Sequence, residues 1–182
     1  MIAIGPVEFS FNDEVTYYAP GWQAQPGELI YLSGCNGSGK SSYLKGLITT
    51  LAPLPLSYVS HNIPQALSLS LGFLAMIFSL FRQGSTLPSS TPYDDLRLSS
   101  LSAGQQRLFL LKNLLSTQST LWIIDEGWIH LDPSVLKFIR KRIEQYLSQG
   151  GIVIYTDHNS SLELPVSQTL EITARTYAIA LF

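Results

Sequence analysis

The strongest constraint on the fold is the segment Gly34-Cys35-Asn36-Gly37-Ser38-Gly39-Lys40-Ser41-Ser42. It follows an apolar run, Leu29 to Leu32, that predicts a short buried strand. It precedes an amphipathic segment, Tyr43 to Leu51, that predicts a helix. A strand, a glycine-rich turn and a helix in this order, with the pattern G-x-x-x-x-G-K-S/T, are typical of a phosphate-binding loop. The segment therefore predicts a binding site for a nucleoside triphosphate.

The residue types in this loop match the chemistry of a triphosphate. Gly34, Gly37 and Gly39 allow positive φ and let backbone N–H groups approach phosphate oxygens closely. Lys40 supplies a mobile positive charge for the β and γ phosphates, and the Ser41 hydroxyl is a ligand suited to Mg²⁺. The N-terminus of the following helix adds a partial positive charge. We therefore expect a nucleoside triphosphate with Mg²⁺ at this loop.

The composition is rich in apolar and poor in charged residues. Of 182 residues, 46% are hydrophobic and 13% are charged, and the length suits one compact domain. Either a parallel sheet buried on both faces or a surface that docks on a membrane partner accounts for this balance. The net charge of −2 gives no electrostatic reason to expect nucleic acid as a partner.

Cysteine and basic residues bear on the compartment. The single cysteine, Cys35, excludes an internal disulfide and fits a reducing compartment. No Lys or Arg precedes Lys40, so the N-terminus lacks the basic part of a signal or transit peptide. We expect the chain to be made where it works, and to be encoded inside the organelle if it is organellar.

The order of the expected elements defines the fold class. Helices that alternate with apolar strands predict an α/β domain with a mostly parallel sheet, preceded by an antiparallel hairpin. The apolar stretch from Ala66 to Phe81 is shorter than the ~20 residues of a membrane span, so we expect a buried or partner-facing helix there. The expected strands are 7–11, 15–18, 29–32, 57–60, 121–124, 152–155, 168–172 and 177–181, and the expected helices are 43–51, 65–82, 102–115 and one from Asp132-Pro133 to Gly150-Gly151.

Two carboxylates and a histidine follow apolar strands. Asp125 and Glu126 come directly after Leu121–Ile124, at the strand end where open α/β sheets bind ligands. Asp125 is placed to hold Mg²⁺ opposite Ser41, and Glu126 to polarise the water that attacks the γ-phosphate. His158 follows another strand and either contacts the γ-phosphate or is an ordinary structural histidine.

These motifs together resemble the ATPase domain of ABC transporters. The resemblance is carried by the phosphate loop, Leu101-Ser102-Ala103-Gly104-Gln105, Asp125-Glu126, Leu131-Asp132 and His158, in that order. Within that family, the segments around the signature, Asp125 and the last strand look most like the haem-exporter ATPase subunits of cytochrome c maturation. The resemblance implies a P-loop NTPase fold in one domain, residues 1–182, with a reduced helical subdomain at about 63–116.

The resemblance also implies roles and partners. Gly34 to Ser42 would be the Walker A loop, Asp125 the Walker B acid, Glu126 the catalytic carboxylate and His158 the switch histidine. Ser102, Ala103, Gly104 and Gln105 would cap the ATP held by a second copy in a head-to-tail dimer. Integral membrane subunits would be the other partners, with the chain peripheral on the inner face of a bacterial or mitochondrial inner membrane. The helix 66–81 would be the docking surface.

The chain departs from the family pattern at several positions. Asn62 stands where the family has a glutamine that contacts Mg²⁺ and couples to the membrane subunits. Gly127 stands where a proline is common, and we expect a looser turn there. The aromatic residue that stacks on adenine has four candidates: Phe9, Phe11, Tyr17 and Tyr18. Two alternatives therefore stay open, a soluble ABC-type ATPase not coupled to transport and a non-hydrolysing nucleotide-binding assembly subunit.

Overall fold

The computed structural model describes residues 1–12, 15–60, 111, 114–115, 118–128, 131–157 and 163–175. The helix expected at 65–82 and the strand expected at 177–181 lie outside these ranges, as does nearly all of the helix expected at 102–115. None of the helices in the described ranges is long and apolar enough to cross a membrane.

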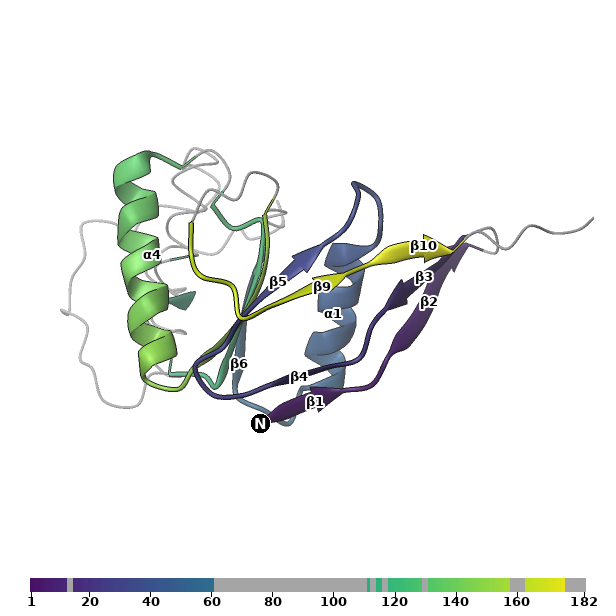
Figure 1. Ribbon diagram of the computed structural model, residues 1–182, viewed down its shortest axis with the longest axis horizontal. Helices are drawn as coiled ribbons and strands as arrows, with labels where there is room; N and C mark the ends of the chain where they lie inside the picture. The colour runs from purple at the N-terminus through teal and green to yellow at the C-terminus, as the bar shows by residue number, and fades with distance from the viewer. Residues whose placement is uncertain are drawn as a thin grey trace, which may run out of the picture.

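Within the described part of the chain, five parallel strands form the central sheet (Figure 1). Its order is β6-β7-β8-β5-β9, and every neighbouring pair is parallel. All side chains of β7 and β8 are buried, as expected for strands covered on both faces. The expected α/β fold with a mostly parallel sheet is therefore confirmed. The strands are β5 Leu29–Ser33, β6 Leu56–Ser60, β7 Leu121–Asp125, β8 Ile152–Thr156 and β9 Gln168–Glu171.

Two helices cover opposite faces of this sheet (Figure 1). Helix α1 (Lys40–Thr50) buries one side with Tyr43, Leu44 and Leu47. Helix α4 (Pro133–Ser148) covers the other face, where the ring of Tyr146 stacks on Trp122 at 3.6 Å between centroids. These layers bury the apolar residues that the composition shows in excess, so the buried-sheet explanation holds.

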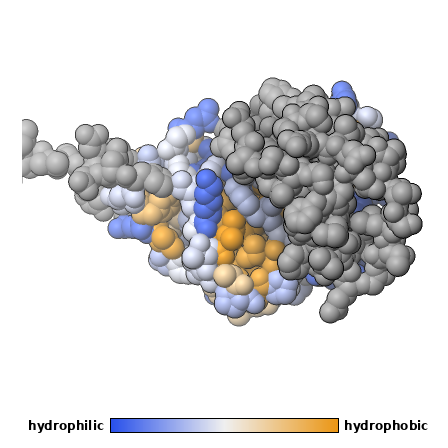
Figure 2. Space-filling view, turned by 180° about the vertical axis from the view of Figure 1, so that it is seen from behind, coloured by the Kyte–Doolittle hydropathy of each residue, from blue (hydrophilic) through white to orange (hydrophobic). Residues whose placement is uncertain are grey.

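The N-terminal strands form smaller antiparallel sheets. The expected hairpin is confirmed as β2 (Val7–Asn12) and β3 (Val15–Ala19), with Phe9 opposite Tyr17. β10 (Thr173–Arg175) joins β3, and a separate pair, β1 (Ile2–Ile4) with β4 (Trp22–Ala24), was not predicted. On the side opposite to that of Figure 1, apolar atoms also reach the surface of the described part (Figure 2).

The ends of α4 match the sequence in position but not in every bond. Asp132 occupies the N-cap position, yet its side chain makes no capping hydrogen bond. Gly150, at φ +86°, follows the C-cap as expected. Arg142 of α4 is half-buried and donates to the carbonyl oxygen of Leu115 at 2.7 Å.

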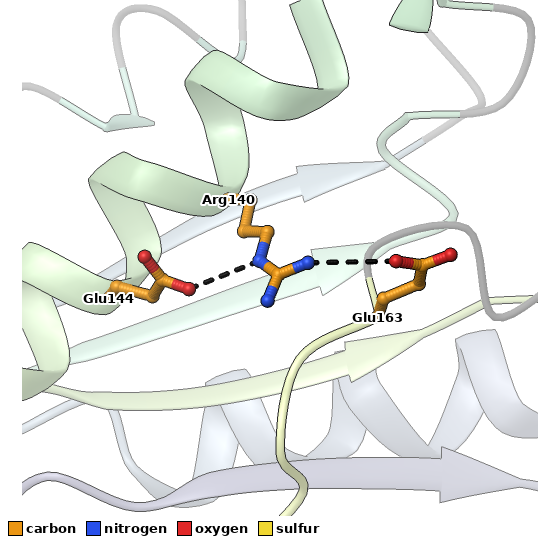
Figure 3. Close-up of polar contacts among 3 residues, drawn as sticks. All are labelled: Arg140, Glu144 and Glu163. Carbon is orange, nitrogen blue, oxygen red and sulfur yellow. Dashed lines mark hydrogen bonds and ion pairs between the residues drawn. The ribbon is translucent and has the colours of Figure 1, made fainter.

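Helix α4 is also linked to the segment before β9 by charge. Arg140 forms ion pairs with Glu144 at 3.1 Å and with Glu163 at 3.7 Å (Figure 3). All three side chains are well exposed, so solvent screening leaves each pair only a small contribution, about 0–1 kcal/mol. These contacts orient the surface of α4 and do not form part of the site at the strand ends.

Candidate nucleotide-binding site

The phosphate loop connects the end of β5 to the start of α1. Gly34, Gly37 and Gly39 have φ of +143°, +78° and +86°, which confirms the expected positive φ. Gly34 is also sterically required, because a Cβ there would lie 2.6 Å from the Ser38 Oγ and 2.7 Å from the carbonyl oxygen of Ile172. The loop therefore takes a tight backbone path that a chain with other residues at these positions would not adopt without strain.

The start of α1 presents the features of an anion site. Gly39 is the N-cap and provides no side-chain capping bond, so the first helical N–H groups remain available to a ligand. The Ser38 hydroxyl is buried and finds no hydrogen-bond partner within the described ranges, although the Ser38 N–H donates to the carbonyl of Cys35 at 3.1 Å. A buried, unpaired hydroxyl beside a helix N-terminus fits a phosphate oxygen.

Lys40 is held within this loop by the loop's own backbone. Its Nζ donates to the carbonyl oxygens of Gly34 at 2.8 Å and Cys35 at 3.0 Å, and its side chain is buried. Two neutral carbonyls do not cancel the ammonium charge, and a lysine has three donors. Lys40 therefore brings a preorganised positive charge to the loop. The other loop residues are Cys35 and Asn36, both exposed, and Ser41 and Ser42, both half-buried in the first turn of α1.

Asp125 ends β7 as a buried carboxylate with one unused oxygen. Only 1% of its surface is exposed, and its Oδ1 accepts a hydrogen bond from the Thr156 hydroxyl at 2.9 Å. Its Oδ2 is buried and, among the described residues, has no hydrogen-bond partner. An orphaned carboxylate oxygen is costly to bury without a proton or a cation. Because carboxylate and hydroxyl oxygens suit Mg²⁺, Asp125 and Ser41 fit the expected metal ligands.

Glu126 follows in a left-handed backbone conformation. Its φ is +53°, which costs a residue with a Cβ about 1–3 kcal/mol and recurs at functional sites. Its N–H donates to the Thr156 Oγ1 at 2.9 Å. These two features fix the backbone conformation of Glu126, immediately after the buried Asp125.

Gly127 is packed more tightly than the sequence predicted. A Cβ at this position would lie 2.6 Å from Ile124 Cγ2, 3.1 Å from Val59 Cγ1 and 3.2 Å from Leu111 Cδ2. We expected Gly127 to loosen the turn, and instead the missing side chain lets the turn close against the core. A proline would not fit this backbone.

Thr156 was not predicted as a site residue, yet it joins the two carboxylate residues. It ends β8, lies opposite Asp125 in the strand register and is fully buried. A threonine at the end of an apolar strand carries no sequence signal of this role, because the contact depends on which strands are neighbours. We refer to Asp125, Glu126 and Thr156 as the carboxylate cluster.

Tyrosines surround the strand ends near Asp157, which is also buried. The Tyr31 hydroxyl donates to the carbonyl of Asp157 at 2.8 Å, and the rings of Tyr31 and Tyr155 lie 5.2 Å apart. Burial raises the pKa of Tyr155 to about 12, with a further contribution from the Asp157 charge. Burial also raises the pKa of Tyr58 on β6, and the Asp125 charge adds to it. These phenols stay neutral at physiological pH.

Other predicted site residues stay predictions. Asn62, His158 and the signature residues Ser102, Ala103, Gly104 and Gln105 lie outside the described ranges. Among the candidates for adenine stacking, the ring of Phe9 stacks on Tyr17 at 5.6 Å and on Tyr43 of α1 at 6.1 Å. The hairpin therefore carries an aromatic row that reaches the helix after the phosphate loop.

Solved structures share this fold. An ATP-binding subunit of an ABC transporter superposes with a TM-score of 0.66 and 18% identity over 86% of this chain and 81% of that chain. An ATP-binding cassette dimer in a post-hydrolysis state with ADP and Pi gives 0.66 and 15% over 89% and 90%. RNase-L inhibitor gives 0.73 and 14% over 94% of this chain and 39% of that chain. The fold is that of an ABC-type ATP-binding domain.

Sequence relatives narrow this class. No family model matches the chain. The cytochrome c biogenesis ATP-binding export protein CcmA of Nitrosococcus oceani is 31% identical over 175 residues, 81% of each chain. CcmA of Shigella sonnei is 31% identical over 158 residues, 72% of this chain and 76% of the relative. The chain belongs to the ABC transporter ATP-binding subunits of the CcmA family, which confirms the resemblance expected from the motifs.

Proposed function

We propose that this chain is the ATP-hydrolysing subunit of a membrane-bound ABC complex that performs haem export or haem release during cytochrome c maturation. The observation that carries the proposal is the 31% identity to CcmA, a cytochrome c biogenesis ATP-binding export protein, over 81% of both chains. The orphaned buried oxygen of Asp125 and the preorganised Lys40 support a working nucleotide site. The whole chain, residues 1–182, would act as one domain.

The chemistry would divide among residues of this chain. The loop from Gly34 to Ser42 would wrap the phosphates, with Lys40 between the β and γ phosphates. Ser41 and Asp125 would hold Mg²⁺, which neutralises developing charge on the phosphates, and Asn62 would contribute its amide to the same site. Glu126 would orient and polarise the attacking water.

A second copy would complete each site. The family resemblance implies a head-to-tail dimer. In that arrangement the signature segment of one chain cannot reach the phosphate loop of the same chain. Ser102, Ala103, Gly104 and Gln105 would therefore cap the γ-phosphate bound by the other copy, with N–H groups suited to an anion. His158 would contact the γ-phosphate and link its presence to the closed dimer.

The membrane partners would be integral subunits of the haem-exporter type. Docking would use the apolar segment 66–81, which begins shortly after Asn62, and would place the chain on the inner face of a bacterial or mitochondrial inner membrane. No nucleic acid is expected as a partner, since the net charge is −2.

Two rival functions make different predictions. A soluble ABC-type ATPase would share the fold, as RNase-L inhibitor does, but would not co-purify with integral membrane proteins. A non-hydrolysing assembly subunit would bind ATP without releasing phosphate. The strained, defined geometry of Glu126 argues against that second rival, because an unused carboxylate has no reason to keep such a backbone conformation.

One experiment separates these functions. The chain is co-expressed with the membrane subunits, the complex is purified, and phosphate release is compared with that of Glu126→Gln. We expect co-purification, ATP-dependent phosphate release by the native complex, and a rate about 10²–10⁴-fold lower in the variant, with ATP binding retained. Equal rates would exclude the role of Glu126, and failure to co-purify would favour the soluble rival.

A further inference from the structure

The Thr156 hydroxyl contacts both carboxylate residues of the cluster, Asp125 and Glu126. It donates to Asp125 Oδ1 at 2.9 Å and accepts from the Glu126 N–H at 2.9 Å. The sheet register ends at the pair Asp125 and Thr156, so beyond it the Glu126 N–H has a side-chain acceptor in place of a strand carbonyl. The Thr156 side chain of β8 thus adds one hydrogen bond to β7 beyond the last backbone pair of the two strands.

The direction of these two bonds is fixed by chemistry. A backbone N–H is only a donor, so Thr156 Oγ1 must accept from Glu126. Its single O–H is then directed at the carboxylate of Asp125, which in its charged form is only an acceptor. Each bond strengthens the other, because a hydroxyl that donates to a charged oxygen is polarised as an acceptor. Both bonds are shielded from bulk solvent, since Thr156 is fully buried.

The backbone of Glu126 gives this link a consequence for the reaction. Its φ of +53° is disfavoured for a residue with a Cβ and persists only where surrounding contacts hold it. The bond to Thr156 is such a contact, and it sits on the peptide that sets the direction of the Glu126 side chain. Asp125 keeps its second oxygen, Oδ2, for the metal.

We propose that Thr156 is a positioning residue that couples the metal-binding carboxylate of Asp125 to the direction of the hydrolytic carboxylate of Glu126. The proposal rests on the proposed ATP hydrolysis and names a residue that acts through the other two. Thr156 acts through its bonds to Asp125 and Glu126. A change at Asp125 on metal binding would thus alter the hydrogen bond to the Glu126 peptide through the Thr156 hydroxyl.

The test compares Thr156→Val, which replaces the hydroxyl by a methyl of similar size, with Thr156→Ser, which keeps it. In the assembled complex we expect Thr156→Val to lower kcat for phosphate release about tenfold to a hundredfold, as for the loss of a charge-assisted hydrogen bond. KM for ATP should change less than about threefold, because the phosphate loop is untouched. Thr156→Ser should restore most of the rate. Thr169→Val, at an exposed threonine of β9, is the matched control.

A second readout does not depend on hydrolysis. Amide hydrogen exchange of the Glu126 peptide should become faster in Thr156→Val and stay slow in Thr156→Ser and Thr169→Val, with exchange of β5 unchanged. If the valine variant does not accumulate as folded protein, Thr156→Ala also removes the hydroxyl and places no methyl group in its position.

The outcomes distinguish this proposal from the proposed function. A wild-type complex that releases no phosphate overturns the hydrolytic function, while local exchange at Glu126 still decides whether Thr156 holds that peptide. A valine variant with wild-type kcat and unchanged exchange overturns the positioning role. A lower kcat together with a lower melting temperature and faster exchange throughout the sheet, without rescue by serine, would show that Thr156 has a purely structural role. That result would overturn the positioning role as well.

Discussion

The phosphate loop and the carboxylate cluster lie beyond the ends of parallel strands of one sheet, but the chain builds them differently. The loop consists of consecutive residues, and its main contacts are with its own backbone, as in the bonds from Lys40 to Gly34 and Cys35. The carboxylate cluster joins two strands, with partners 31 residues apart in Asp125 and Thr156. The loop depends on local backbone conformation, whereas the cluster depends on strand register.

The first way to test this difference is to remove the charge of the loop. Lys40→Met should weaken ATP binding about tenfold to a hundredfold, since hydrogen bonds to charged groups contribute about 1.5–3 kcal/mol. The fold should be kept, because the lost bonds are to loop carbonyls only. Binding is measured by isothermal titration, with Lys45→Met as the control at an exposed position of the same helix. Equal affinities in the two variants would contradict the role of Lys40.

The second test adds one methyl group at the turn of the cluster. Gly127→Ala should destabilise the protein by about 1–3 kcal/mol, the usual cost of overpacking. The new Cβ would lie 2.6 Å from Ile124 Cγ2, so the neighbouring side chains would have to shift. Hydrolysis should fall with it, because Glu126 is the neighbouring residue. Unfolding in urea and phosphate release are the two measurements.

The matched control for this substitution is Gly46→Ala on α1. Nothing lies within 4 Å of a Cβ at Gly46, and the residue is exposed. Alanine should stabilise that helix by about 0.5–1 kcal/mol. If both substitutions changed the free energy of unfolding in the same direction, the steric account of the turn at Gly127 would be wrong.

The same difference explains what the sequence could predict. The sequence predicted strands β5 to β8, helix α1 and the phosphate loop, because each is determined by residues that are adjacent in the sequence. Asp132 was placed correctly as an N-cap, but its capping bond does not form, since position in a sequence does not fix a side-chain rotamer. Thr156 and the close packing at Gly127 were missed because both depend on neighbours from β6, β7 and β8.

The third test uses pH and has the smallest expected effect. The pKa of Tyr155 is raised from 10.0 to about 12 in the folded protein, mainly by burial and further by the charge of Asp157. The unfolded chain therefore loses this proton first. The stabilisation is complete below pH 10 and is lost as the pH rises through about 12.

Tyr155 directly precedes Thr156 on β8, so its ionisation should destabilise the strand that carries Thr156. Tyr155→Phe keeps the ring contacts with Tyr31 and Trp128 but has no proton to lose, so its unfolding free energy should fall less steeply above pH 10. Urea unfolding at several alkaline pH values measures this, with Tyr18→Phe on the outer hairpin as the control. Identical pH profiles for native protein and Tyr155→Phe would mean that other groups govern the alkaline transition. A shallower profile for Tyr155→Phe, with that of Tyr18→Phe unchanged, would show that the buried Tyr155 hydroxyl contributes to alkaline unfolding.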